Sequence, residues 1–235
     1  MDIGIGLDPT LRLDIEQQKE MSREAARLGY QSIWTPEVPG QMDSYQVCLM
    51  RWAASNEIVD GGLETGIAVS PVMWRTPMAF AMTGGTVSHM TGGKFIMGIG
   101  AGGAYRPDVR RTIGLPKMSA LSLMRDYISI IKELVNEGKT DYEGDVGIMK
   151  GGRMSINPLP KTPVYLGALG PKMLQLAGEL ADGAALNWCA PEQVAWSRDR
   201  IAEGAEKVGR DPSEIKVSEY IRICVDEDED RARIA

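Results

Sequence analysis

A turn in the second half of the sequence combines residue types that suit an anion. A predicted apolar strand over 164–166 leads into the run Gly167, Ala168, Leu169, Gly170, Pro171 and Lys172. Proline is favoured at the first helical position, where its missing N–H has no partner to lose. The unpaired N–H groups of this helix start, together with the charge of Lys172, favour a phosphate or carboxylate. A plain helix start with a solvated lysine is the alternative interpretation.

Two carboxylates are placed for proton transfer. Asp8 and Glu37 follow the predicted strands 2–7 and 31–34, and carboxyl groups commonly serve as general acids or bases. We therefore predict both as catalytic residues, the alternative being that each only caps or solvates a loop. Asn187 lies in a later predicted strand and is a candidate cofactor contact. With one histidine and no Cys-x-x-Cys pair, the sequence lacks metal-ligand spacing, and we predict no metal site.

A glycine-rich run follows the predicted strand 94–100. Residues 98–103 read Gly-Ile-Gly-Ala-Gly-Gly and match G-x-G-x-x-G. As a dinucleotide fingerprint this pattern needs a helix directly behind it, and the residues that follow are a poor helix opening. We therefore give the dinucleotide interpretation little weight.

The order of the predicted elements favours a barrel. Strands are expected over 2–7, 31–34, 63–70, 94–100, 164–166, 184–188 and 216–225, with helices between most of them. Strands that alternate with helices predict a parallel sheet. Seven such units favour a (β/α)8 TIM-type barrel, in which functional residues lie at the carboxyl ends of the strands.

The strand count is one short of a closed barrel. An open barrel leaves the first and seventh strands with unpaired backbone edges, which proteins avoid. We therefore expect the sequence to be a single domain over 1–235 that lacks the last strand and its helices. Residues of about 140–157 interrupt the alternation and predict an inserted hairpin.

Composition limits the classes of partner. The net charge of −6 and the absence of a basic stripe argue against nucleic acid. No apolar run approaches the length of a membrane span, and the start of the chain does not resemble a signal segment. Three scattered cysteines fit a reducing compartment, so we expect a cytoplasmic protein. The expected partners are a small-molecule substrate and a second copy in a dimer, with neither nucleic acid nor membrane.

Three segments in the right order resemble one known family. The run 88–102 resembles the fourth-strand signature of the bacterial-luciferase-like monooxygenase superfamily. The segment Gly170-Pro171-Lys172-Met173, with 176–179 and 181–183, resembles the fifth-strand region of its deazaflavin (coenzyme F420)-dependent branch. Residues 204–205 and 209–212 are similar to the segment that precedes strand seven in that branch.

The resemblance implies a TIM-type barrel that binds F420 or FMN at the carboxyl ends of its strands. It also implies a bulge with a non-prolyl cis peptide bond after the third strand, backing the cofactor ring, and glycines that let the ring and its tail approach the backbone. The implied cofactor-binding residues are Ala68, Val69, Ser70, Gly100, Gly102, Gly167, Ala168, Gly170, Pro171, Lys172 and Asn187.

The function implied is an F420-dependent oxidoreductase that transfers a hydride between deazaflavin C5 and a small organic or pterin-type substrate. One alternative is an FMN-dependent two-component monooxygenase of the same fold. A second alternative, from another class, is a non-catalytic flavin-binding or interaction protein.

Overall fold

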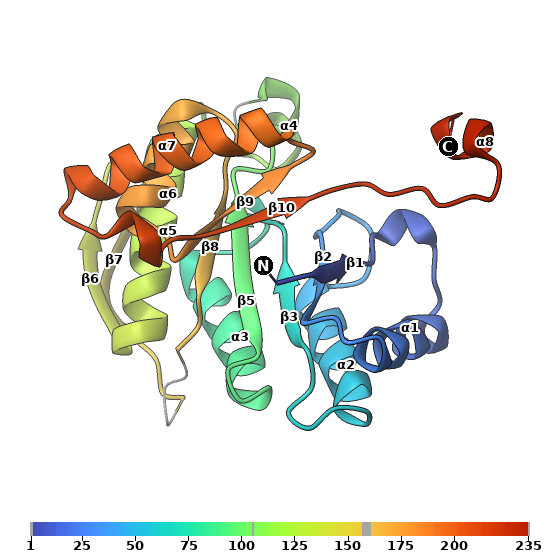
Figure 1. The fold of residues 1–235 in the computed structure, drawn as a ribbon. Coiled ribbons are helices and arrows are strands. Elements are labelled where there is room, and N and C mark those ends of the chain that lie inside the picture. Colours follow the sequence, from blue (N-terminus) through green and yellow to red (C-terminus); the bar gives the residue numbers. More distant parts are fainter. Residues whose placement is uncertain (1, 105, 157–160, 235) are drawn as a thin grey trace.

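The computed structural model describes residues 2–104, 106–156 and 161–234, in which helices cover the outer face of a curved sheet (Figure 1). The strands are β1 (Gly4–Gly6), β2 (Ser32–Thr35), β3 (Glu64–Ile67), β4 (Ser70–Pro71), β5 (Phe95–Gly100), β6 (Lys139–Glu143), β7 (Ile148–Arg153), β8 (Val164–Gly167), β9 (Gly183–Asn187) and β10 (Lys216–Tyr220). The α-helices are α1 (Ile15–Arg27), α2 (Ser44–Asn56), α3 (Pro77–Met90), α4 (Pro107–Thr112), α5 (Ala120–Glu137), α6 (Pro171–Leu180), α7 (Pro191–Lys207) and α8 (Glu229–Ile234). Short 3-10 helices span Pro9–Leu11, Val72–Trp74 and Pro212–Glu214.

The main sheet is parallel and nearly closed. Its strands lie in the order β1-β2-β3-β5-β8-β9-β10, and β4 pairs with β5 beyond the end of β3. Each strand of that order pairs in parallel with its neighbour, so the predicted parallel barrel sheet is confirmed. Within the described residues β1 and β10 do not pair, which leaves an open seam between them.

The hydrophobic core lies between the sheet and its outer helices. Every residue of β5 is buried, which fits a central parallel strand covered on both faces. Phe80 of α3 and Ile128 and Ile131 of α5 are fully buried in the same cluster. Burial of one such side chain contributes about 1.5–3 kcal/mol, so this layer fixes the helices to the sheet.

Aromatic rings fill the barrel interior where facing glycines make room. The Trp34 ring lies where a Cβ on Gly66 would stand, and the Tyr165 ring does the same at Gly183. The ring centroids of Trp34 and Tyr165 are 6.2 Å apart, a distance that fits a favourable aromatic pair. These rings form a packed floor beneath the carboxyl-end face.

The predicted insertion is an antiparallel hairpin of β6 and β7. Asp126 of α5 is buried and holds its turn, accepting hydrogen bonds from the N–H groups of Val146 and Gly147 at 2.7 and 2.8 Å. The Tyr142 hydroxyl donates to the same carboxylate at 2.9 Å. Residue 157, the predicted end of the insertion, lies outside the described residues.

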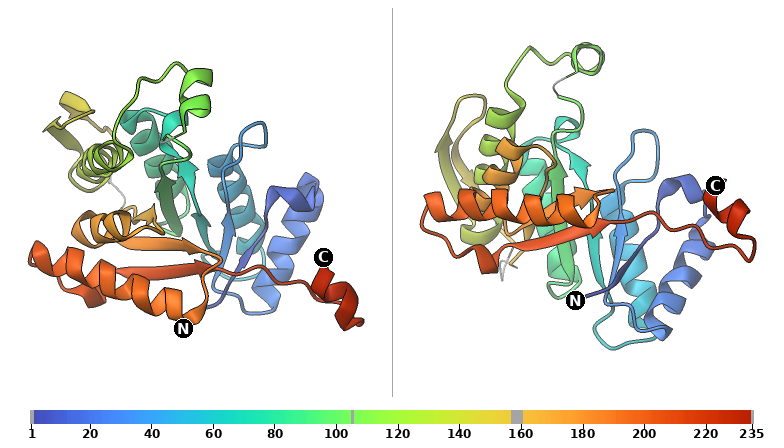
Figure 2. Two further views of the ribbon diagram at one scale, coloured as in Figure 1. Left: turned by 90° about the horizontal axis from the view of Figure 1, so that it is seen from above. Right: turned by 45° about the horizontal axis from the view of Figure 1, so that its top comes forward.

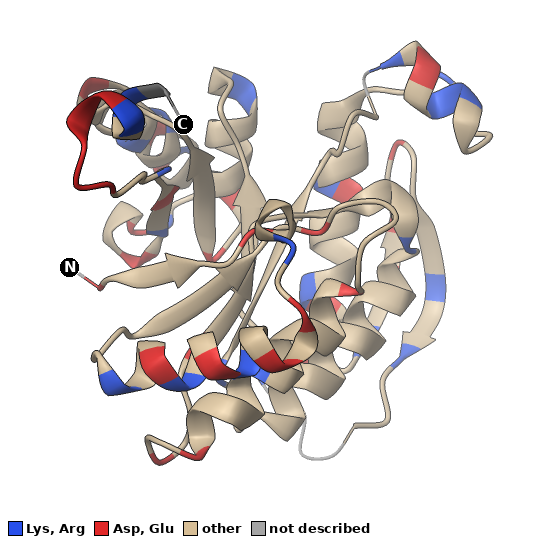
Figure 3. Cartoon of the chain, turned by 90° about the vertical axis from the view of Figure 1, so that its right-hand side faces the viewer, with Lys and Arg blue, Asp and Glu red and all other residues tan. Residues whose placement is uncertain are grey.

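The surface carries a charged helix face on α1 and an extended segment after β10. Acidic and basic residues alternate along the exposed face of α1 and form ion pairs such as Lys19–Glu16 and Arg27–Glu24 (Figure 3). Beyond β10 the chain runs away from the sheet and ends at α8 (Figure 2). Within the described part of the chain, no helix is both long and apolar enough to cross a membrane.

Candidate functional site

The carboxyl ends of the parallel strands bring the predicted site residues to one face. Asp8 lies after β1, Glu37 after β2 and Ser70 after β3. Gly100 ends β5, and Asn187 ends β9 as an exposed residue. Residues 167–172 follow β8 on the same face. Because parallel strands all point the same way, one face collects residues that are far apart in the sequence.

A bulge follows β3 at the centre of this face. The peptide bond between Ala68 and Val69 is cis and non-prolyl, as the resemblance implies. The N–H of Ala68 donates to the Thr35 carbonyl at 2.9 Å, and the N–H of Glu37 donates to the Val69 carbonyl at 3.4 Å. These bonds hold the bulge against the end of β2.

The neighbouring glycines are needed by the bulge itself. A Cβ on Gly100 would lie 2.5 Å from Val69 Cγ2, and one on Gly167 would lie 3.1 Å from both Val69 methyl groups. A Cβ on Gly98 would lie only 1.9 Å from the Ile67 carbonyl oxygen. Gly102 has a φ of +56° and stands against Pro71. The glycines of the G-x-G-x-x-G run therefore face protein atoms, which gives them a packing role of their own.

Glu37 lies in a charged cluster beneath the bulge. Its Oε2 accepts hydrogen bonds from the Ser70 hydroxyl and from Arg75 Nη1. Arg75 also donates to the Asp43 carboxylate, and its Nη1 lies 3.3 Å from the Ser70 hydroxyl oxygen. The Glu37 side chain is 11% exposed and that of Arg75 is 15% exposed. A guanidinium that donates hydrogen bonds to two carboxylates compensates their negative charges where little water can reach them.

Aromatic rings complete this cluster. The Arg75 guanidinium carbon lies 4.8 Å from the ring centroid of Tyr45 and 5.8 Å from that of Phe80. Tyr45 is fully buried, and burial raises the pKa of its hydroxyl well above the usual value. The structure places Arg75 beside the bulge, where its guanidinium contacts both Glu37 and Ser70.

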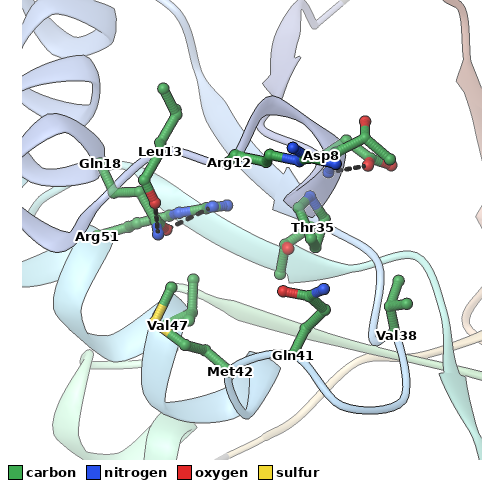
Figure 4. Close-up of a pocket in the computed structure, with 12 residues that line it drawn as sticks. Asp8, Arg12, Leu13, Gln18, Thr35, Val38, Gln41, Met42, Val47 and Arg51 are labelled. Atoms are coloured by element: carbon green, nitrogen blue, oxygen red, sulfur yellow. Dashed lines mark hydrogen bonds between the residues drawn. The ribbon is translucent and has the colours of Figure 1, made fainter.

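Asp8 caps a short helix and also lines a pocket. Its Oδ1 accepts a hydrogen bond from the Thr10 N–H at 2.8 Å, the loop-capping contact that the sequence left open as an alternative. The pocket has a volume of about 460 Å³ and lies between the loops after β1 and β2 (Figure 4). Its polar lining includes Asp8, Arg12, Gln41 and Arg51.

The start of α6 is open to solvent. Gly170 is its N-cap, with no side-chain hydrogen bond to the helix, and a Cβ there would meet nothing within 4 Å. Pro171 and Lys172 are both exposed. Ala168 is held by a hydrogen bond from its N–H to the Ala185 carbonyl at 3.2 Å. The helix start therefore presents unpaired backbone donors and a lysine to the same face.

The end of β9 carries an exposed aromatic residue. Trp188 follows Asn187 with a φ of +55°, and its N–H donates to the Tyr220 carbonyl at 3.0 Å. The Arg222 guanidinium carbon lies 4.3 Å from the Trp188 ring centroid. The predicted site residues thus surround one face, with Glu37 and Ser70 in direct contact and Asn187 at the rim.

Comparison with known proteins shows the family and the fold of this chain. A family model described as luciferase-like monooxygenase matches residues 3–234. The chain is 28% identical over 228 residues to a 5,10-methylenetetrahydromethanopterin reductase of Methanolobus tindarius, covering 97% of this chain and 66% of that protein. It is therefore about two thirds as long as this relative.

Solved structures share the fold. The coenzyme F420-dependent tetrahydromethanopterin reductase from Methanopyrus kandleri superposes with a TM-score of 0.82 at 23% identity, covering 98% of this chain and 68% of the other. A type II Baeyer-Villiger monooxygenase from Pseudomonas putida, in complex with FMN, superposes with a TM-score of 0.73 at 16% identity, covering 100% and 70%. On the family match, the chain belongs to the luciferase-like monooxygenase family.

Proposed function

We propose that this chain is the cofactor-binding barrel of an F420-dependent oxidoreductase. The observation that carries the proposal is the similarity, along 97% of the chain, to a reductase of 5,10-methylenetetrahydromethanopterin. The coenzyme F420-dependent tetrahydromethanopterin reductase from Methanopyrus kandleri shares the fold. The proposed substrate is a small organic or pterin-type molecule with an electrophilic carbon.

The residues of the carboxyl-end face fit a cofactor with an anionic tail. Gly170, Pro171 and Lys172 would hold a phosphate, because the α6 start has unpaired backbone donors and no capping side chain. The Lys172 side chain forms no hydrogen bond or ion pair with any described residue, so its charge is available to an anion. The bulge at Ala68–Val69 would back the ring of the cofactor.

The protein would position two rings and keep water away, since the deazaflavin supplies the hydride chemistry when bound. Arg75 and Ser70 hold the Glu37 carboxylate in one orientation beside the bulge. Asp8 lines the pocket between the loops after β1 and β2. We propose Glu37 and Asp8 as the carboxylates that contact the substrate or a proton it exchanges.

Equilibrium titration with F420 and with FMN tests this proposal. Changes in cofactor and tryptophan fluorescence report binding, and we expect saturable binding of F420 and none of FMN at the same concentration. Binding of FMN alone would contradict the proposal and favour the two-component monooxygenase. Binding of neither cofactor by the folded chain would contradict it in favour of a non-catalytic role.

A further inference from the structure

The pocket between the loops after β1 and β2 contains a buried arginine. Arg51 of α2 is 4% exposed and lines this pocket. Its Nη2 donates to the Leu7 carbonyl at 3.1 Å and to Gln18 Oε1 at 2.9 Å, and its Nη1 donates to the Trp34 carbonyl at 3.3 Å. Figure 4 shows the guanidinium pointing toward the space between Arg12 and Thr35.

The hydrogen bonds of Arg51 leave part of its donor capacity unused. A guanidinium carries five N–H groups, and the three contacts above are all to neutral oxygens. Its Nε is buried without a hydrogen-bond partner among the described residues. A buried polar donor without a partner costs free energy. The Nη1 group donates only one of its two N–H bonds, so it has a second N–H to offer to an acceptor in the pocket.

The charge of Arg51 also has no counterion. Burial lowers the pKa of its guanidinium to about 10, so it stays protonated at neutral pH. The neighbouring thiol of Cys48 is buried, and burial raises its pKa to about 12, so this group is neutral. No ion pair joins Arg51 to a carboxylate within the described residues, and no carboxylate is among the groups that shift its pKa. A buried charge is normally paired.

The rim of the pocket adds side chains that can donate hydrogen bonds to an anion. Arg12 has a φ of +51° and is exposed, and its side chain forms no hydrogen bond or ion pair with a described residue. The side chain of Gln41 points into the same space (Figure 4). The pocket's one carboxylate, Asp8, already accepts the Thr10 N–H. Two arginines against one aspartate leave the pocket with a net positive charge.

We propose that this pocket binds the carboxylate group of an organic acid, with Arg51 at its floor and Arg12 at its rim. Both N–H bonds of Arg51 Nη2 are already used, so the contact from Arg51 is a single hydrogen bond from Nη1. A charge-assisted hydrogen bond from a guanidinium to a carboxylate is stronger than one between neutral groups. No residue of α6 or of the bulge lines the pocket, so the proposal does not depend on F420 binding at the start of α6. Asp8, which lines the pocket, is the one residue that it shares with the proposed function. It assigns a ligand-binding role to the loops after β1 and β2.

Succinate and its neutral analogue succinamide test this proposal directly. The protein is labelled with 15N at arginine Nε, and the Arg51 Nε–H resonance is followed by NMR at constant ionic strength. We expect a saturable shift with succinate and none with succinamide. An equal response to both, a response to neither, or binding of inorganic phosphate in place of succinate would overturn the proposal.

Substitution of the rim arginine separates this site from a general charge effect. Arg12→Ala should weaken succinate binding about tenfold, the equivalent of one charge-assisted hydrogen bond. Arg198→Ala is the matched control, because Arg198 is exposed on α7, away from the pocket, and should leave the affinity unchanged. Equal affinities for Arg12→Ala and the unaltered chain would overturn the proposal without requiring any change at Arg51.

Discussion

At the residue scale, the cluster around Glu37 joins three elements through side chains. Glu37 follows β2, Ser70 begins β4 and Arg75 lies just before α3. Their hydrogen bonds hold the loop after β2 against the bulge. The cluster is largely withdrawn from solvent, so the loss of one partner leaves a charge poorly compensated.

Glu37→Gln should lower the free energy of unfolding by about 2 kcal/mol, because Arg75 keeps only Asp43 as a charged partner. Urea denaturation at neutral pH measures this change. Glu16→Gln is the matched control: its ion pair with Lys19 is exposed, so its effect should stay within about 0.5 kcal/mol. Equal effects of the two substitutions would show that the Glu37 cluster does not stabilise the fold.

Part of this cluster was predictable from the sequence. Glu37 follows a predicted strand, and Ser70 is among the cofactor-binding residues that the family resemblance implies. The role of Arg75 was missed, because it pairs with a carboxylate 38 residues away. Such a contact depends on how the loops after β2 and β3 pack against each other. No short-range pattern in the sequence predicts that packing.

At the element scale, the glycines of β5 determine how closely the bulge can approach. Gly98→Ala would bring a methyl group to 1.9 Å from the Ile67 carbonyl oxygen, and backbone atoms of a central strand cannot easily move away. We expect a loss of about 2–3 kcal/mol in the free energy of unfolding, measured by thermal or urea denaturation.

Gly170→Ala provides the contrast, since the added Cβ meets nothing within 4 Å and the φ there is −91°. Its cost should stay below about 1 kcal/mol, the scale of an N-cap change. If Gly98→Ala were as stable as Gly170→Ala, the close contact between Gly98 of β5 and the Ile67 carbonyl at the end of β3 would be contradicted.

Glu179 of α6 ties three helices together. Its carboxylate accepts hydrogen bonds from Arg125 of α5 and from Lys207 of α7. Burial raises the pKa of Glu179, but these two hydrogen bonds outweigh it, so the pKa lies below its usual value of 4.5. A carboxyl group with a lowered folded-state pKa contributes stability above its unfolded pKa, and that contribution disappears as pH falls.

Glu179→Gln should therefore cost about 2 kcal/mol at pH 7 and flatten the fall in stability below about pH 4.5. Urea denaturation at a series of pH values measures both effects. Glu24→Gln, which removes an exposed carboxylate of α1, should keep the full acid dependence. An unchanged acid dependence in Glu179→Gln would contradict the assigned role.

The order of elements was predictable because apolar runs mark the strands and glycines follow the ends of several helices. The anion-ready start of α6 follows from its proline, and the β6–β7 hairpin from the break in alternation. The sequence did not reveal α4, a short helix in the loop after β5, or the β4–β5 pairing. Both consist of few residues, and tertiary contacts determine them more than local propensity does.

At the scale of the whole molecule, the sheet is open where an eighth strand would close a barrel. The strands β1 and β10 end the sheet, as the count of predicted strands indicated. Beyond β10, Ile221, Ile223 and Val225 are 66%, 79% and 89% exposed. An exposed apolar stripe of this kind favours contact with further protein surface. Dimer formation, expected from the sequence, remains a prediction.

The extended segment after β10 should be the first place that a protease cuts. Arg222 lies in it without regular secondary structure, and exposed segments of this kind are preferred cleavage sites. Limited trypsin digestion followed by mass spectrometry should give a fragment ending at Arg222 before any cut at Arg51 or Arg125, which lie in packed helices. Earlier cleavage within α2 or α5 would contradict the packing described.

The central claim is that the carboxyl-end face binds F420 through the start of α6. Its most direct test is the F420 dissociation constant of the unaltered chain, of Lys172→Ala and of Lys216→Ala, measured by fluorescence titration. Lys216 is also an exposed lysine, but it lies at the opposite, amino end of a strand. We predict affinity about tenfold lower for Lys172→Ala, from one lost charge-assisted contact, and unchanged affinity for Lys216→Ala. Equal F420 affinities for all three chains, or no F420 binding by any of them, would contradict the account.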